Sequence, residues 1–459
     1  MNLNHSLSQK FFIKPSLACL PLLEKLIDHA LMKKQFSLRD IAIVYVHHPL
    51  KTSVNLIDSM VRLGAMPKNI FVLGKKYSEC ETVVQQITRY GVHYQPCSTQ
   101  IGLGQYNLSF IRDINLLWKK VSDNLGKDIQ KLLILDHGGY ATSFIPVPIL
   151  KQYKVIAVEK TTAGLIKFKD QGLPPFPLIS VADCAAKKIL ESPLIAEAIV
   201  NKLLTLIPKN PATAKCGIIG FGAIGKAIAI KLLSMNYKVM IYDRCFRSSK
   251  IPKGITFTDN LDKIVGFSDY LFGCTGQESI KTIEAFIHAE KDKTLISCSS
   301  EDKEFLPLLK AMQRKNNELV QDPFAEIRYI TPKGATIRIL KGGFPVNFDH
   351  SGESVPPRDI QLTRALVLTS IIQAIQFFNK KSLLNKAGIY ALDAKTQQFL
   401  ANEWLKDQPV VRYSQDIIRN FQNPDWIIKN SGGIYEPCSI IESSANTILS
   451  SEHPKLHFK

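Results

Sequence analysis

The feature that most constrains the fold of this chain is a glycine-rich segment near its middle. A short apolar run leads directly into Gly220, Gly222 and Gly225, which have the spacing G-x-G-x-x-G. A helical pattern of apolar residues follows, and the next apolar run ends in the acid Asp243. A strand, a glycine turn, a helix and a second strand that ends in a carboxylate together predict a Rossmann-type dinucleotide-binding unit.

Each part of this unit has a physical reason to bind a dinucleotide. The first glycine permits a tight turn, the second lets the backbone approach a pyrophosphate, and the third lets the helix pack on the strand. The helix N-terminus offers unpaired N–H groups to phosphates. Asp243 is placed to accept hydrogen bonds from ribose hydroxyls and would repel a 2′-phosphate, which favours NAD over NADP, although the neighbouring Arg244 weakens that preference. We therefore predict NAD as the cofactor, with a unit that has lost its ligand as the alternative. The predicted cofactor-binding residues here are Gly220, Gly222, Ala223, Ile224, Gly225 and Asp243.

The rest of the chain predicts an α/β protein of more than one domain. Short β-branched apolar runs at residues 41–46, 69–74, 132–136 and 155–158 alternate with helical patterns, as in a parallel sheet. A long amphipathic helix is expected over residues 358–378. We expect a Rossmann-type NAD-binding domain inserted between parts of an α/β substrate domain. The expected segments are a substrate and catalytic domain at 1–194, the NAD domain at 195–350, a returning helix at 351–410, and a tail of unknown role at 411–459.

Composition narrows the class of protein. The 459 residues carry 58 Lys and Arg against 40 Asp and Glu, a net charge of +18. The lysines are scattered in pairs without a basic block or zinc-finger spacing, so a lysine-rich solvated surface is favoured over nucleic-acid binding. The nine cysteines include no C-x-x-C pair, which indicates reduced thiols and no metal site. We expect no apolar stretch to approach the roughly 20 residues that cross a bilayer, and no signal peptide is recognisable. A cytoplasmic protein without membrane contact is therefore expected.

Several motifs outside the glycine unit occur in a recognisable order. His48 follows the first apolar run, and Leu135-Asp-His-Gly-Gly139 and Val158-Glu-Lys-Thr-Thr-Ala-Gly164 follow later runs. A segment that ends at Asp183 precedes Lys187 and Glu191. In order and spacing, these motifs resemble those of the S-adenosylhomocysteine hydrolase family over roughly residues 40 to 380.

The resemblance implies a chemistry and a set of residues. It implies a bound NAD that oxidises a substrate hydroxyl, with Lys187 and Glu191 at the hydroxyl and His48 as acid and base. The further NAD contacts that it implies are Thr161, Thr162, Thr275, Gly276 and Asn347.

Departures from the family's pattern indicate a changed substrate. His137 and Lys160 stand where the family has substrate-binding carboxylates, a charge reversal that would suit an anionic substrate such as a carboxylate or phosphate. The expected substrate is therefore a nucleoside-like or an anionic hydroxy compound. We therefore predict a homo-oligomeric NAD-dependent enzyme with altered substrate specificity, in which His137 and Lys160 contact the substrate and the oxidation is transient or net. Two alternatives remain open at this point: a true adenosylhomocysteinase, and an NAD-binding homologue without catalytic activity.

Overall fold

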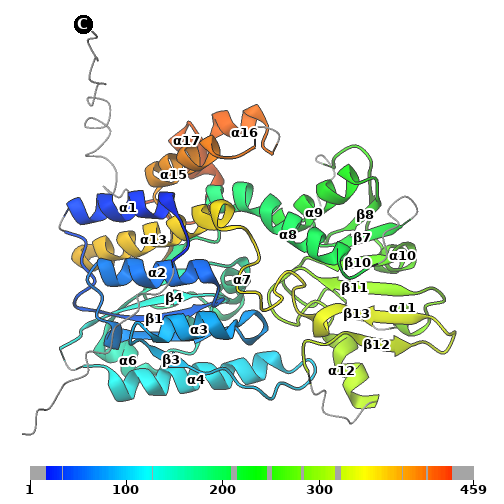
Figure 1. Cartoon of the computed structure of the whole chain (residues 1–459), viewed down its shortest axis with the longest axis horizontal. Helices are drawn as coiled ribbons and strands as arrows, with labels where there is room; N and C mark the ends of the chain where they lie inside the picture. The colour runs from blue at the N-terminus through cyan, green and yellow to red at the C-terminus, as the bar shows by residue number, and fades with distance from the viewer. Residues whose placement is uncertain are drawn as a thin grey trace, which may run out of the picture.

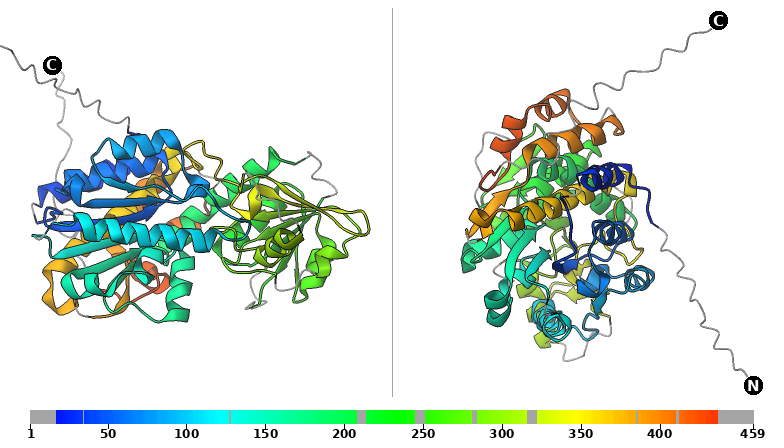
Figure 2. Two further views of the ribbon diagram at one scale, coloured as in Figure 1. Left: turned by 90° about the horizontal axis from the view of Figure 1, so that it is seen from below. Right: turned by 90° about the vertical axis from the view of Figure 1, so that its left-hand side faces the viewer.

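The computed structural model describes residues 17–33, 35–126, 128–207, 214–244, 251–280, 284–315, 322–384, 386–409 and 412–436. Figure 1 shows two lobes that lie side by side, each built on its own β-sheet, and the left view of Figure 2 shows the same division from below. The expected fold class is confirmed, because the chain forms part of the first sheet, then the whole second sheet, and then returns to the first.

The first sheet is parallel throughout and has the strand order β3-β2-β1-β4-β5-β6-β14. The order reverses direction between β1 and β4, so loops at the carboxyl ends of these two strands diverge and leave a crevice. Its strands are β1 (Ile41–His47), β2 (Ile70–Gly74), β3 (His93–Gln95), β4 (Lys131–Asp136), β5 (Lys154–Glu159), β6 (Pro177–Ser180) and β14 (Gly388–Ala391).

Helices cover both faces of the first sheet, which explains why its strands are apolar without alternation. Ile43 and Tyr45 of β1 point into one cluster with α1 (Pro21–Met32), α2 (Lys51–Arg62) and α13 (Pro357–Asn379). Val44 and Val46 point into the opposite cluster with α4 (Tyr106–Asn124), α5 (Tyr140–Ser143) and α7 (Thr162–Gln171).

The second sheet has the strand order β9-β8-β7-β10-β11-β13-β12. Six strands run parallel in the order of a dinucleotide-binding fold, and β12 pairs antiparallel with β13 at the edge. One face packs on α8 (Ser192–Leu204) and α9 (Ala223–Ser234), and the other on α10 (Leu261–Phe267) and α12 (Leu306–Lys315). The strands are β7 (Lys215–Ile219), β8 (Lys238–Tyr242), β9 (Ile255–Thr258), β10 (Tyr270–Gly273), β11 (Lys293–Ser297), β12 (Ile327–Ile330) and β13 (Thr336–Ile339).

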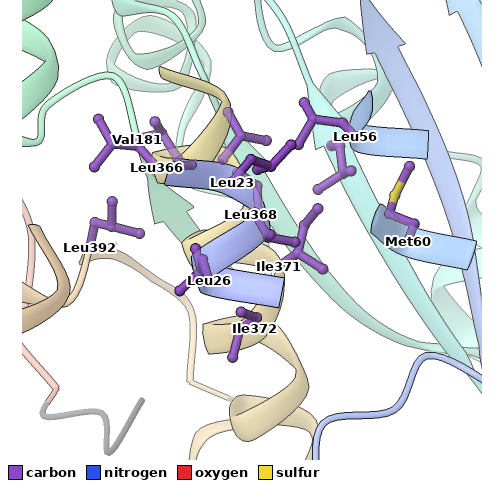
Figure 3. Packing of buried hydrophobic residues seen from close by; sticks show 14 of the residues in the cluster. Leu23, Leu26, Leu56, Met60, Val181, Leu366, Leu368, Ile371, Ile372 and Leu392 are labelled. Carbon is purple, nitrogen blue, oxygen red and sulfur yellow. The ribbon is translucent and has the colours of Figure 1, made fainter. Parts of the chain in front are cut away.

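Helix α13 corrects two expectations about its segment. It is long and apolar enough to cross a membrane by length and composition, contrary to the expectation that no stretch approaches that length, but 83% of its most apolar window is buried inside the protein. It is also buried on nearly all sides rather than amphipathic. Figure 3 shows the reason: Leu368, Ile371 and Ile372 of α13 pack with Leu26 of α1 and with α2.

The expected tail is partly folded. Within the described residues, α15 (Ala394–Lys406) packs on α17 (Pro424–Asn430), with α16 (Gln415–Asn420) between them in sequence. Ile434 then pairs with Tyr390 beside β14 and extends the edge of the first sheet. Residues 437–459 of the tail lie outside the described residues. The other described helices are α3 (Glu81–Thr88), α6 (Val147–Gln152), α11 (Glu284–Ile287) and α14 (Lys381–Leu384).

Candidate functional site

A cavity of about 600 Å³ lies where the carboxyl ends of the two sheets meet. On the first sheet, its walls come from the loops after β1, β4 and β5, and on the second sheet from the loops after β7, β8, β10 and β11. Both points of reversed strand order therefore open into one space, which is where α/β folds bind ligands. The predicted residues that line it are His48, His137, Lys160, Thr161, Thr162, Lys187, Glu191, Gly220, Gly222, Ala223, Ile224, Asp243, Thr275, Gly276 and Asn347.

The three glycines of the fingerprint have different surroundings. A Cβ added at Gly220, where φ is +96°, would lie 2.8 Å from the backbone of Cys274. At Gly225 a Cβ would lie 1.9 Å from the carbonyl oxygen of Gly220, so this residue packs the helix on the turn and does not line the cavity. Gly222 lines the cavity and has open space where its Cβ would be, which leaves room for a cofactor phosphate.

The acid at the end of β8 joins the glycine turn. An Oδ of Asp243 accepts a hydrogen bond from the backbone N–H of Phe221 at 2.7 Å. Asp243 and Arg244 both line the cavity. The carboxylate is thus held at the mouth of the glycine turn, where it would meet the ribose hydroxyls of a dinucleotide.

The loop after β10 is held by a buried glutamate that sequence reasoning did not place in the site. The two carboxylate oxygens of Glu304 accept from the backbone N–H of Gly276 at 2.7 Å and from the hydroxyl of Thr275 at 2.8 Å. Glu304 is fully buried, and burial raises its pKa. Its role is to fix the backbone of the loop, which we predicted to contact NAD.

Two histidines meet at the reversal point of the first sheet. The rings of His48, after β1, and His137, after β4, lie edge to face with centroids 4.4 Å apart, and His48 also stacks on Phe348 at 4.3 Å. The Ser78 hydroxyl donates to the carbonyl of Lys75 at 2.9 Å, so it accepts from Nδ1 of His48 at 2.6 Å. This arrangement fixes the tautomer and leaves the Nε2 of His48 as a proton acceptor.

The surroundings of this histidine pair keep both rings uncharged. Burial, together with the positive charge of Lys75, holds the pKa of His48 well below its usual value of 6.5. Burial and the neighbouring His48 lower the pKa of His137 in the same way. Both imidazoles are therefore neutral at neutral pH.

Lys160 lines the cavity but is not a free cation. Its Nζ donates to the carbonyl of Val46 at 2.8 Å and lies 4.5 Å from the centre of the Tyr45 ring. Burial lowers the pKa of Lys160 to about 7, against the opposing effect of the neighbouring Glu159. Its charge at neutral pH therefore depends on what occupies the cavity.

The threonines after β5 line the cavity, and Thr161 also holds the loop in place. The hydroxyl of Thr161 donates to Glu159 at 2.6 Å and accepts from the N–H of Gly164 at 3.1 Å, which caps α7. The same Glu159 carboxylate accepts from the backbone N–H of Gly139 at 2.8 Å. Thr161 and Thr162 therefore lie at the cavity because Glu159 ties the loops after β4 and β5 together.

Lys187 and Glu191 lie together, as the resemblance implied. They form an ion pair of 2.5 Å within a π-helical turn (Lys187–Glu191) just before α8. Such turns are rare and frequently occur at functional sites. The negative charge of Glu191 balances the positive charge of Lys187. The pair is therefore suited to bind a hydroxyl more than an anion.

Sequence reasoning missed Arg364 on α13, which also lines the cavity. Its helix is apolar on nearly every side, so no periodic signal marked this position. His350 lies on the surface outside the cavity, where its Nδ1 donates to the carbonyl of Glu79 at 2.8 Å.

Comparison with known proteins identifies the cofactor half. Residues 200–285 match the NAD-binding domain of D-isomer specific 2-hydroxyacid dehydrogenases. This match spans β7 to β10 of the second sheet and confirms the prediction of a nicotinamide cofactor.

Proteins that align with more than half of this chain have low sequence identity to it. The uncharacterized protein Rv0104 of Mycobacterium tuberculosis is 28% identical over 353 residues, which are 76% of this chain and 67% of that protein. A D-lactate dehydrogenase of Lactobacillus jensenii aligns with 72% of this chain and 96% of its own, at 14% identity and a TM-score of 0.35. A glyoxylate/hydroxypyruvate reductase of Sinorhizobium meliloti aligns with 56% of this chain and 82% of its own, at 14% identity and a TM-score of 0.36.

The expected membership of the S-adenosylhomocysteine hydrolase family is wrong. The family model that matches residues 200–285 is the NAD-binding domain of D-isomer specific 2-hydroxyacid dehydrogenases. The motif order misled because a glycine turn, a carboxylate and polar strand ends recur wherever two α/β domains face each other across a nicotinamide site. The alternative of a true adenosylhomocysteinase falls with it.

Proposed function

We propose that this protein is an NAD(P)-dependent oxidoreductase that interconverts a small hydroxy acid and the corresponding oxo acid. The observation that carries the proposal is the neutral His48, whose Nδ1 is committed to Ser78 and whose ring lines the same cavity as the glycine turn. The family that matches residues 200–285 is named for 2-hydroxy acids, which supports this substrate class.

The residues of the chain account for the proton and for substrate binding. A bound nicotinamide supplies the hydride acceptor when the hydroxyl is oxidised. His48 takes the hydroxyl proton on Nε2, and the positive charge that it gains is delocalised over a ring that stacks on Phe348. His137 orients the His48 ring edge to face, while Lys187 and Glu191 offer a donor and an acceptor to the reacting oxygen.

Spectrophotometry with the reduced and oxidised cofactors tests the proposal. We expect the full chain to reduce small 2-oxo acids with NADH or NADPH. His48→Gln should lower kcat about 100-fold or more at unchanged NADH affinity, because the group that takes the hydroxyl proton in the oxidation, and returns it to the oxygen in the reduction, is lost. The matched control is His93→Gln, since His93 of β3 stacks on Phe71 of β2 outside the cavity. Binding of NADH without turnover of any hydroxy or oxo acid would contradict the proposal and favour a non-catalytic homologue.

A further inference from the structure

The cationic side chains that line the cavity differ in how their charge is balanced. Lys187 is paired with Glu191 at 2.5 Å, and Lys188 lies 3.9 Å from Asp183. Arg244 is exposed and keeps its hydration. None of these three presents an unbalanced charge to the cavity.

Arg364 is different. It is half-buried on α13, and among the described residues it lies in no ion pair, although a carboxylate within 4.0 Å would form one. The neighbouring Lys160 adds positive charge and has a pKa lowered to about 7 by burial. A guanidinium group stays protonated at any pH that a protein tolerates, and a desolvated, unpaired charge is costly. Among the described residues, Arg364 therefore holds a fixed positive charge against the cavity with no carboxylate in direct contact, and the acid that its hydrogen bonds lead to, Glu353, is reached only through Thr52.

Hydrogen bonds orient this arginine toward the cavity. Its Nε donates to the hydroxyl oxygen of Thr52 at 3.0 Å. The Thr52 hydroxyl proton is committed to a carboxylate oxygen of Glu353 at 2.8 Å, and its backbone N–H donates to the same oxygen at 3.1 Å. Thr52 thus can only accept from Arg364, which fixes the Nε edge and leaves the two Nη groups as a planar fork.

We infer that Arg364 binds the carboxylate of the substrate through this fork, so that α13 sets the preference for acids over neutral compounds. The inference rests on the proposed function and adds the residue that selects the substrate class. A bound carboxylate would balance the charge of Arg364 and would also favour the protonated form of Lys160 beside it. Arginine suits this role because its fork matches a carboxylate, whereas lysine is a point charge.

Calorimetric titration of the NADH-loaded protein with oxamate, a carboxylate that cannot be reduced at the reacting position, tests binding without turnover. We expect Arg364→Gln to weaken oxamate binding about 100-fold and Arg364→Lys about 10-fold, because the lysine keeps the charge and loses the fork. The uncharged oxamide should bind all variants equally weakly. The matched control is Arg358→Gln, an exposed arginine on the same helix that should bind oxamate like the wild type.

Steady-state kinetics separate this inference from the proposed function. Turnover of oxo acids with an unchanged KM in Arg364→Gln would overturn the inference and leave the function standing. Oxamate binding that depends on Arg364, without turnover of any acid, would overturn the function and leave the inference standing. Failure of oxamate to bind the NADH-loaded wild type would overturn the inference. NADH affinity reports whether each variant is folded, and Arg364→Lys carries the test if Arg364→Gln does not fold.

Discussion

At the scale of single residues, two glycines of the same turn have different roles. A Cβ at Gly225 would lie 1.9 Å from the carbonyl of Gly220, whereas at Gly222 nothing lies within 4 Å. The carbonyl oxygen of Gly220 belongs to the backbone and cannot move aside as the end of a flexible side chain can. Gly225 is therefore required for packing. Gly222 keeps space open for a ligand.

This contrast predicts opposite outcomes for two alanine substitutions. Gly225→Ala should lower the free energy of unfolding by about 2–3 kcal/mol, as overpacking does. Gly222→Ala should leave stability within about 0.5 kcal/mol and weaken NADH binding about 10-fold or more, because its Cβ enters the cofactor space. Urea denaturation and NADH fluorescence titration measure the two effects. Equal stability losses in both variants would contradict the assignment.

A buried histidine makes stability depend on pH. Burial and the charge of Lys160 hold the pKa of His47 well below 6.5, and its Nδ1 donates to the carbonyl of His48 at 2.8 Å. The unfolded chain takes up a proton near pH 6.5 that the native chain does not, so this residue costs stability as the pH falls below that value. His47→Gln removes the cost.

Between about pH 7.5 and 5.5, His47→Gln should therefore gain about 1.4 kcal/mol relative to the wild type. Chemical denaturation at the two pH values gives the difference directly. The comparison between variants cancels the opposite effect of Glu159 and Asp302, whose pKa values burial raises to about 7. A difference that does not change with pH would show that His47 titrates normally in the native state.

At the scale of elements, the loop after β10 depends on one carboxylate. Glu304 accepts from Gly276 and Thr275, and its own carbonyl accepts from the Ser279 hydroxyl at 2.7 Å. Glu304→Gln replaces one acceptor oxygen by a donor, so that the loop loses one of these bonds. We expect NADH affinity to fall about 10-fold.

Isothermal titration with NADH measures this effect. The control is Glu290→Gln, because Glu290 is exposed and pairs with Lys333 on the surface. NADH affinity in Glu304→Gln equal to that of the control would show that the loop does not contact the cofactor.

At the scale of the whole molecule, a buried ion pair joins the two lobes. Lys75 follows β2 of the first sheet, and its Nζ lies 2.8 Å from a carboxylate oxygen of Glu301, which follows β11 of the second. Both side chains are at most 1% exposed. Lys303 holds the other oxygen at 2.8 Å, and together the lysines keep the pKa of Glu301 below its usual range although burial opposes this. The pair fixes how the carboxyl edges face each other.

Glu301→Gln should therefore cost about 3–5 kcal/mol of stability, because Lys75 is left charged and buried. The double variant Lys75→Met with Glu301→Gln should recover most of the loss, because no fully buried charge is left without a partner; Lys303 also loses its partner, but its side chain is 24% exposed. Thermal denaturation compares the three proteins. A double variant no more stable than Glu301→Gln would show that the loss comes from elsewhere.

Local patterns in the sequence predicted the fold class, the cofactor turn and polar residues that line the cavity, because strand, turn and strand-end signals lie within a few positions of each other. What they could not predict depends on contacts distant in sequence. Lys75 and Glu301 are 226 positions apart, and Arg364 is 312 from Thr52. The family resemblance failed for a related reason: strand-end polar residues indicate where a site lies, not which reaction it performs.

The central claim, net hydride exchange with a hydroxy acid, is tested most directly by isotope transfer. The full chain is incubated with a small 2-oxo acid and NADH that carries deuterium at the position of the transferred hydride, and the products are analysed by mass spectrometry. We predict deuterium on the carbinol carbon of the hydroxy acid, together with oxidised cofactor in equal amount. Bound NADH that keeps its label with every oxo acid offered would contradict the account.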